Sequence, residues 1–196
     1  MYFGSILHNI TKNVLLNKEE SDYFISLLQY KEFEKKEHLL KEGQACTVIN
    51  YVQSGALRAY CLDDKGKEAT VMFAVNDWWI TDMYCFVNRK PAMVFIEAIE
   101  KSAILQLRKD DLETLYIKVP KFERIFRILM QNAYTREQLR IIESLSMTAD
   151  ERYERFINKY PQIIPHLTQK QIASYLGITP EFLSVIRKQK AKGNIS

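Results

Sequence analysis

The sequence predicts an α+β protein with an N-terminal antiparallel β-roll (jelly roll), one long helix and an all-helical C-terminal domain. Three observations lead to this prediction. Residues 31–107 are short apolar segments separated by turn signals, with no helical period between them. After residue 108 the apolar spacing becomes helical and stays so. Residues 169–188, QKQIASYLGITPEFLSVIRK, have the pattern of two short helices joined by a tight turn.

Composition narrows the class of protein. A chain of 196 residues that is 47% hydrophobic and 27% charged can form one large or two small globular domains. Its three cysteines, Cys46, Cys61 and Cys85, are far apart and form no CxxC pair. This spacing argues against a zinc site or an iron–sulfur cluster and predicts reduced, buried thiols. Because we find neither a signal peptide nor an apolar run of roughly 18 residues, we expect a cytoplasmic protein with no membrane contact.

The elements of the first domain, residues 1–119, are predicted in chain order. A short helix is expected at 17–30, where apolar residues recur at helical spacing. Asp63-Asp64-Lys65-Gly66 is a tight hairpin signal. A second short helix is expected at 110–116. Strands are expected on either side of the hairpin signal and further on, at 38–40, 48–52, 56–61, 68–75, 93–99 and 103–107.

A long helix is predicted for residues 120–146, with Pro120 at its start. A helix of about 26 residues is roughly 39 Å long at 1.5 Å per residue. Its apolar residues cover more than one stripe, so we expect one stripe to cover the β-roll and another to meet the same helix of a second subunit. The alternative is that all of it packs on the roll. The residues predicted for the dimer interface are Phe122, Phe126, Leu129 and Ala133.

The third domain, residues 147–196, is predicted to be a helix-turn-helix. Capping boxes begin new helices at Thr148 and Thr168, each with Glu or Gln three residues later. Gly177 can take the positive φ that ends a helix, and Thr179-Pro180 has the residues of a helix N-cap and first position. Leu183 and Ile186 are expected to lie on the inward face of the second helix of this module.

DNA binding is predicted from the residues on the outer side of this module. Residues 1–108 contain 13 basic and 14 acidic residues, whereas residues 109–196 contain 15 and 10, so the excess positive charge lies toward one end. We expect Glu181 to accept from a cytosine amino group and Ser184 to sit against a base edge. The residues predicted to contact DNA are Gln169, Lys170, Thr179, Pro180, Glu181, Ser184, Val185, Arg187 and Lys188, with Lys190 and Lys192 adding charge. Arg187 and Lys188 are assigned to phosphates. The alternative is an ordinary helical corner in a core.

The order of these elements resembles the bacterial CRP/FNR family of transcription regulators over nearly the whole chain. Residues 51–60, YVQSGALRAY, followed by Asp63, Gly66-Lys67-Glu68 and Phe73, are similar to the early strands and glycine turn of its β-roll. IASYLGIT at 172–179 and LSVIRK at 183–188 are similar to its DNA-binding element. The resemblance implies a homodimer that binds double-stranded DNA at a near-palindromic operator, with RNA polymerase as a further candidate partner.

The sequence departs from this family at two places. Where cyclic-nucleotide-binding members carry Gly-Glu, this chain has Thr81-Asp82, and Pro91 has no N–H for a phosphate. At the other end, Pro180 and Val185 stand where members often place Arg, and too few residues follow for a β-hairpin wing. Neither a cofactor nor a cysteine cluster for FNR-type oxygen sensing is identifiable. The expected effector is therefore an unknown small molecule rather than a cyclic nucleotide, in a pocket formed by Thr81, Asp82, Met83, Arg89, Pro91 and Ala92.

Two alternatives to DNA binding are an enzyme and a module that contacts protein. An enzyme of the cupin type would need clustered metal ligands, but His8, His38 and His166 are far apart and form no HxH pair. The sequence has no Gly-rich phosphate loop and no nucleophile motif, so no catalytic or metal-binding residue is predicted. The other alternative is a non-catalytic ligand-sensing or interaction module whose helix-turn-helix contacts protein rather than DNA.

Overall fold

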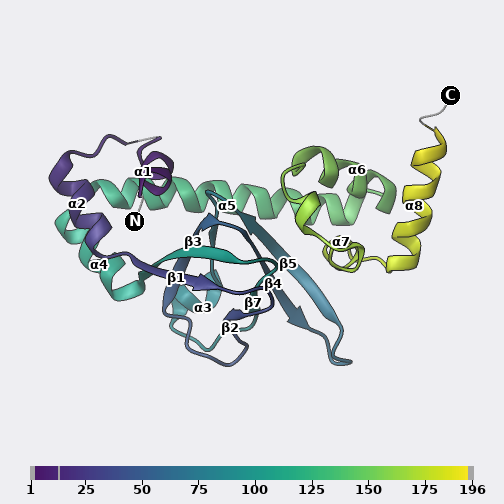
Figure 1. Cartoon of the computed structure of the whole chain (residues 1–196), viewed down its shortest axis with the longest axis horizontal. Coiled ribbons are helices and arrows are strands. Elements are labelled where there is room, and N and C mark those ends of the chain that lie inside the picture. The colour runs from purple at the N-terminus through teal and green to yellow at the C-terminus, as the bar shows by residue number, and fades with distance from the viewer. Residues whose placement is uncertain (1–2, 13, 194–196) are drawn as a thin grey trace.

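The computed structural model describes residues 3–12 and 14–193. One long helix, α5 (Lys121–Ser146), runs along the molecule, and the β-roll lies against one side of it (Figure 1). The N-terminal helices lie near one end of α5, and the three C-terminal helices α6 to α8 lie at the other. This arrangement confirms the predicted α+β class.

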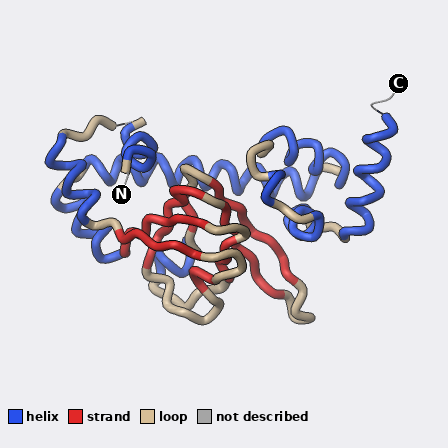
Figure 2. The backbone as a smooth tube through the Cα atoms, viewed as in Figure 1, coloured by secondary structure: helices blue, strands red, loops and turns tan. Residues whose placement is uncertain are grey.

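The β-roll consists of two four-stranded antiparallel sheets that face each other (Figure 2). Tyr51, Leu57 and Leu105 are among the fully buried side chains of the core. The first sheet has the order β1 (Gln29–Phe33), β8 (Ser102–Arg108), β3 (Val48–Ser54), β6 (Trp79–Ile80). The second has the order β2 (His38–Leu40), β7 (Phe95–Ala98), β4 (Ala56–Leu62), β5 (Glu68–Val75).

Two tight turns fix the centre of the roll. Gly55 joins β3 to β4 with φ +93, and a Cβ there would lie 2.3 Å from the Ser102 Oγ, so only glycine fits. The predicted hairpin after β4 is present, with Asp63 Oδ1 accepting from the backbone N–H groups of Lys65 and Lys67. The backbone therefore turns where the sequence signals are.

Helices cover the open side of the roll. They are α1 (Gly4–Thr11), α2 (Lys18–Ser26) and α4 (Lys109–Lys118), and a short α3 (Met83–Asn88) follows β6. The rings of Phe24 on α2 and Phe122 on α5 lie 4.8 Å apart, which joins these helices to the core. Sequence reasoning missed α1, α3, β1 and β6, and it extended α2 into the first residues of β1, which begins at Gln29.

The four residues predicted for a dimer interface face the roll of their own chain, which corrects that expectation. Phe122 and Phe126 are buried, and the Phe126 ring packs edge-on against Trp79 and Tyr116. Leu129 and Ala133 line a cavity between α5 and the roll. The outward side of α5 instead carries exposed apolar residues in its second half, namely Tyr134, Ile141, Ile142 and Leu145.

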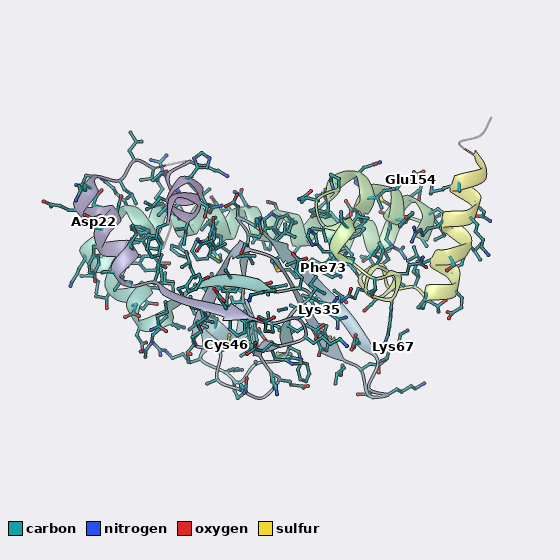
Figure 3. The ribbon with its side chains drawn as sticks, in the orientation of Figure 1. Asp22, Lys35, Cys46, Lys67, Phe73 and Glu154 are labelled. Carbon is teal, nitrogen blue, oxygen red and sulfur yellow. The ribbon has the colours of Figure 1, made fainter. Side chains whose placement is uncertain are left out.

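The C-terminal helices are α6 (Ala149–Lys159), a 3₁₀ turn (Ile164–His166), α7 (Gln169–Leu176) and α8 (Pro180–Gly193). Both predicted capping boxes are present at Thr148 and Thr168. These helices share a hydrophobic cluster with the β-roll, in which Phe73 of β5 contacts the rings of Phe156 and Tyr175 (Figure 3). The helical domain is therefore docked on the roll rather than separated from it.

The docking contact is centred on an irregularity in β5. The register between β4 and β5 shifts there, because Ala59 pairs with Met72 and Tyr60 pairs with Thr70, which leaves Val71 as the extra residue of a bulge. The Thr70 N–H donates to Ser174 Oγ on α7 at 2.9 Å, and that hydroxyl donates to the Glu68 carbonyl at 2.8 Å. Helix α7 thus bonds the backbone of β5 on both sides of Thr70.

Arg140 of α5 binds the same bulge from a second direction. Its guanidinium donates to the carbonyls of Thr70, Val71 and Tyr175 and lies 4.2 Å from the centre of the Tyr175 ring. Burial raises the pKa of the Tyr175 phenol to about 12, against the opposing effect of the Arg140 charge, so this phenol stays protonated at neutral pH. One side chain therefore links α5, β5 and α7.

Arg140→Ala is expected to loosen α7 from the roll. Hydrogen bonds from a charged donor contribute about 1.5–3 kcal/mol, so local opening of α7 is expected to become roughly 10–150 times more frequent. Native-state hydrogen exchange of the α7 amides measures this opening. Arg127→Ala is the matched control, because Arg127 is exposed on the same helix and bonds only Gln131. Equal exchange in the two variants would contradict the assigned role of Arg140.

Candidate nucleic-acid interface

The two helices of the predicted DNA-binding module meet at a tightly bonded turn. Gly177 ends α7 with φ 69, and its N–H donates to the carbonyls of Ala173 and Ser174. The next N–H, of Ile178, donates to the Ala173 carbonyl at 3.0 Å, which completes a glycine-based helix cap. Thr179 then caps α8, since its hydroxyl accepts from the Phe182 N–H at 3.2 Å. Together, the local sequence signals at Gly177 and Thr179 predicted this turn.

The packing of the module leaves one face of α8 open. Leu183 and Ile186 are buried on α8, and the small Ala173 is buried on α7 where the two helices contact each other. Because these inward residues are three positions apart, they define one side of the helix, and the opposite side is directed away from the protein. In Figure 1, α8 lies at the far end of the molecule from the N-terminal helices.

Most of the residues predicted to contact DNA are exposed. Pro180 and Ser184 are only half-exposed. Ser184 Oγ bonds to the Pro180 carbonyl at 3.0 Å and the Gln169 side chain at 3.3 Å, so its hydroxyl links α8 to α7 instead of standing free for a base. The exposed residues are Gln169, Lys170, Thr179, Glu181, Val185, Arg187 and Lys188.

Sequence reasoning missed an apolar residue on this face. Phe182 has 47% of its surface exposed, and Val185, one turn further on, has 46%. Helical spacing alone did not show this exposure, because Phe182 is four residues before the buried Ile186 and would be expected on its side of the helix. The outer face of α8 is thus mixed, with apolar and charged side chains together.

The positive charge near α8 is partly used within the protein. Lys190, which was expected to add positive charge, forms an ion pair with Glu154 of α6; Glu154 is labelled in Figure 3. Arg187 lines a groove between α6 and α8 and is exposed. The side chain of Lys192 lies outside the described residues.

A cavity of about 400 Å³ lies between the roll and α5. Its lining is mainly apolar, with Trp78, Trp79 and Met72 from the roll and Leu129 and Ala133 from α5. Arg136 also lines the cavity, but its guanidinium lies 5.4 Å from the centre of the Trp78 ring and contacts Glu137 at 3.4 Å. The cavity therefore favours a ligand that is apolar over most of its surface.

The structure separates the residues predicted for an effector pocket, which corrects that prediction. Thr81, Asp82 and Met83 line the cavity, but Arg89 and Pro91 line a different groove, and Ala92 is buried in the core. Arg89 forms an ion pair with Asp110 at 2.9 Å. The loop after α3 carries these later residues away from the cavity.

Asp82 is committed to backbone bonds. One carboxylate oxygen accepts from the Cys85 N–H at 3.2 Å as the N-cap of α3, and the other accepts from the Met93 N–H at 2.8 Å. A side chain that is buried with both oxygens bonded in this way holds the loop together. It is poorly suited to bind a sugar hydroxyl as well.

The three cysteine thiols differ in their burial. Cys46, Cys61 and Cys85 are free, and burial raises the pKa of the Cys46 and Cys85 thiols, so these two stay protonated at neutral pH. Cys61 is only partly buried.

Within residues 3–12 and 14–193, no group of three or more His, Cys, Asp or Glu side chains is placed to hold a metal ion. In the same residues, no helix has both the length and the apolarity needed to cross a membrane.

Comparisons with known proteins agree with this geometry. Residues 30–118 match the family described as "Cyclic nucleotide-binding domain". The "Anaerobic regulatory protein" of Aggregatibacter actinomycetemcomitans is 25% identical over 181 residues, which cover 86% of this chain and 70% of that protein. The "Fumarate and nitrate reduction regulatory protein" of Vibrio cholerae is 24% identical, with 92% and 76% covered. Over most of its length, the chain is similar to transcription regulators of the CRP/FNR family.

A solved structure has the same architecture. A transcriptional regulator of the CRP/FNR family from Eubacterium rectale superimposes with a TM-score of 0.72 at 20% identity, covering 91% of this chain and 85% of that one. These similarities support a DNA-binding regulator of CRP/FNR type. The protein is a regulator rather than an enzyme.

Proposed function

We propose that this CRP/FNR regulator binds a near-palindromic operator as a homodimer, with the outer face of α8 in the major groove. The observation that carries the proposal is the open face of α8, on which Glu181, Val185 and Lys188 lie opposite the buried Leu183 and Ile186. Two copies related by a two-fold axis would place their recognition helices about 34 Å apart, in successive major grooves. The half-site centres are then roughly ten base pairs apart.

The roles within a half-site follow from side-chain chemistry. Glu181 lies in the first turn of α8, and a carboxylate there can accept from a cytosine amino group. Lys188 is two turns further on and is assigned to a phosphate, as is Arg187 on the flank. Ser184, which was expected to contact a base, is assigned instead to positioning α8 on α7.

The dimer contact is assigned to the outward stripe of α5. Tyr134, Ile141 and Leu145 are seven and four residues apart, which places them on one side of the helix, and Leu145 is 84% exposed. Apolar residues at these spacings are typical of a helix that pairs with a second helix. This stripe replaces the inward residues that the sequence suggested.

Ile141→Glu is expected to convert the dimer to monomers. The substitution would bury two unpaired carboxylates at the two-fold axis, costing several kcal/mol. Light scattering on dilute protein measures the mass. Asn132→Glu is the control, since Asn132 is exposed on the same helix but lies about half a turn away from Ile141. A monomeric wild type, or an intact dimer in Ile141→Glu, would contradict the assignment.

We propose further that the effector of this regulator is not a cyclic nucleotide. The apolar lining of the cavity supports this, as do the two backbone bonds of Asp82 and the ion pair that keeps Arg89 in a different groove. A cyclic phosphate needs donors or a cation that it can reach, and Arg136, the cation that lines the cavity, already contacts Glu137 and the Trp78 ring.

Calorimetric titration with cyclic AMP and cyclic GMP at micromolar concentrations is expected to give no heat above dilution. Saturable binding with a dissociation constant of about 10 μM or tighter, some −7 kcal/mol, would show that the cavity has been misinterpreted. Asp82→Asn offers a check on a positive result. Binding by a ribose contact to the carboxylate would be lost in that variant.

Glu181→Ala and Lys188→Ala are expected to affect operator binding in different ways. Loss of Glu181 should relax the preference at one base pair by about 1–3 kcal/mol and leave the salt dependence nearly unchanged. Loss of Lys188 should weaken binding to all sequences and lower the salt slope by about one unit per contact, so about two in a dimer.

Titration of both variants against operator and scrambled DNA at three salt concentrations separates these effects. A change of base preference in Lys188→Ala, or equal weakening on all sequences in Glu181→Ala, would refute the placement of α8 in the groove.

A further inference from the structure

An exposed aliphatic side chain lies beside the charged residues on the outer face of α8. At 3.6 residues per turn, Val185 lies next to Glu181 and Lys188 around the helix and nearly opposite the buried Leu183. Phe182, three residues before Val185, is its neighbour on the helix surface. Both side chains leave nearly half of their area in water in the free protein. A recognition helix with this face brings two apolar groups to the bases.

Val185 and Phe182 cannot read a base through hydrogen bonds. Valine and phenylalanine side chains carry no donor and no acceptor, so they cannot replace the bidentate contact by which an arginine reads guanine. Placed over guanine, Val185 would remove water from its N7 and O6 acceptors and leave them unpaired, which is unfavourable. Guanine is therefore disfavoured at this position.

The major groove offers one apolar group, the 5-methyl of thymine. Contact between that methyl and Val185 would bury apolar area on both sides, which is favourable. The exposed charges of Lys188 and Arg187 lie on one side of Val185, where they can contact phosphates along an edge of the groove. The face therefore combines apolar and charged side chains.

We propose that Val185, assisted by Phe182, reads a thymine methyl in each half-site of the operator. This inference rests on the proposed function, because it requires α8 to lie in the major groove. It assigns the specificity at one base pair to Val185 and adds Phe182, which no sequence motif singled out, to the DNA-contacting residues.

The inference can be tested with DNA that lacks single methyl groups. An operator is first selected from a random duplex pool with the full-length protein, and each thymine is then replaced by uracil. At the thymine that faces Val185, uracil is expected to lower the affinity about fourfold in one half-site and about fifteen-fold in both, the effect of removing one or two buried methyl groups.

Substitutions at Val185 identify the residue responsible. Val185→Ala is expected to bind thymine and uracil operators with nearly equal affinity, and Val185→Arg to prefer guanine at that position. Both changes are at an exposed helical position and are compatible with folding. Lys188→Ala is the control, because loss of a phosphate contact should weaken both operators alike and retain the difference between them.

Three results would overturn the inference. They are an operator with no thymine whose methyl matters, a Val185→Ala variant that still distinguishes thymine from uracil, and a Val185→Arg variant with unchanged preference. Failure to select any sequence would contradict DNA binding itself and, with it, this inference. Selection of an operator that is indifferent to thymine methyls would contradict the inference alone.

Discussion

The contact between the bulge in β5 and the C-terminal helices determines where the DNA-binding face lies. A bulge leaves backbone groups of one strand outside the ladder, and buried groups of this kind need partners. At Thr70 and Val71 the partners are Ser174 and Arg140, from two different helices. The Ser174 hydroxyl donates once and accepts from both the N–H and the hydroxyl of Thr70, so its bonding capacity is fully used. The orientation of α7 on the roll is thereby fixed, and α8 follows from it through the turn at Gly177.

The same strand also borders the cavity. Val71 and Met72 line it, and Trp78, at the end of the β5–β6 connection, contacts Tyr160 of α6 through its ring. Because interior packing is dense, residues cannot move into or out of the cavity without displacing their neighbours. An occupant that shifted Val71 or Met72 would act on the strand that holds α7. The strand that lines the cavity is therefore in direct contact with the C-terminal helices.

Local signals were sufficient to predict most of the elements, but not which side of an element faces the core. The capping residues, the hairpin at Asp63 and the glycine at 177 depend on bonds between near neighbours, which the sequence displays directly. Helix α5 is different, because its apolar residues cover more than one stripe. The period cannot tell which stripe meets the roll, and the inward stripe with Phe122 was assigned to the partner. That choice is made by contacts with Phe24, Trp79 and Tyr116, which are distant in sequence.

The same limit applies to the candidate sites. Arg89 was grouped with Thr81 and Asp82 because they are close in sequence, yet a left-handed residue at Arg89 ends α3 and turns the chain toward another groove. Ser184 and Lys190 were read as free because the sequence does not show Gln169 or Glu154 beside them. The exposure of Phe182 could not be predicted from spacing, because this residue is four positions before the buried Ile186.

The corrected assignments change the balance of forces expected at the DNA. With Lys190 paired to Glu154 and Ser184 bonded to Pro180 and Gln169, fewer groups near α8 are available to phosphates and base edges than the composition suggests. Each phosphate contact that is absent removes part of the salt-dependent, sequence-independent affinity. A larger share of the binding free energy must then come from the fit of the outer face to the bases and from presenting two such faces at once. A regulator of this kind depends more on its dimer geometry than one whose recognition helix carries several arginines, and the apolar stripe on α5 is the surface suited to provide that geometry.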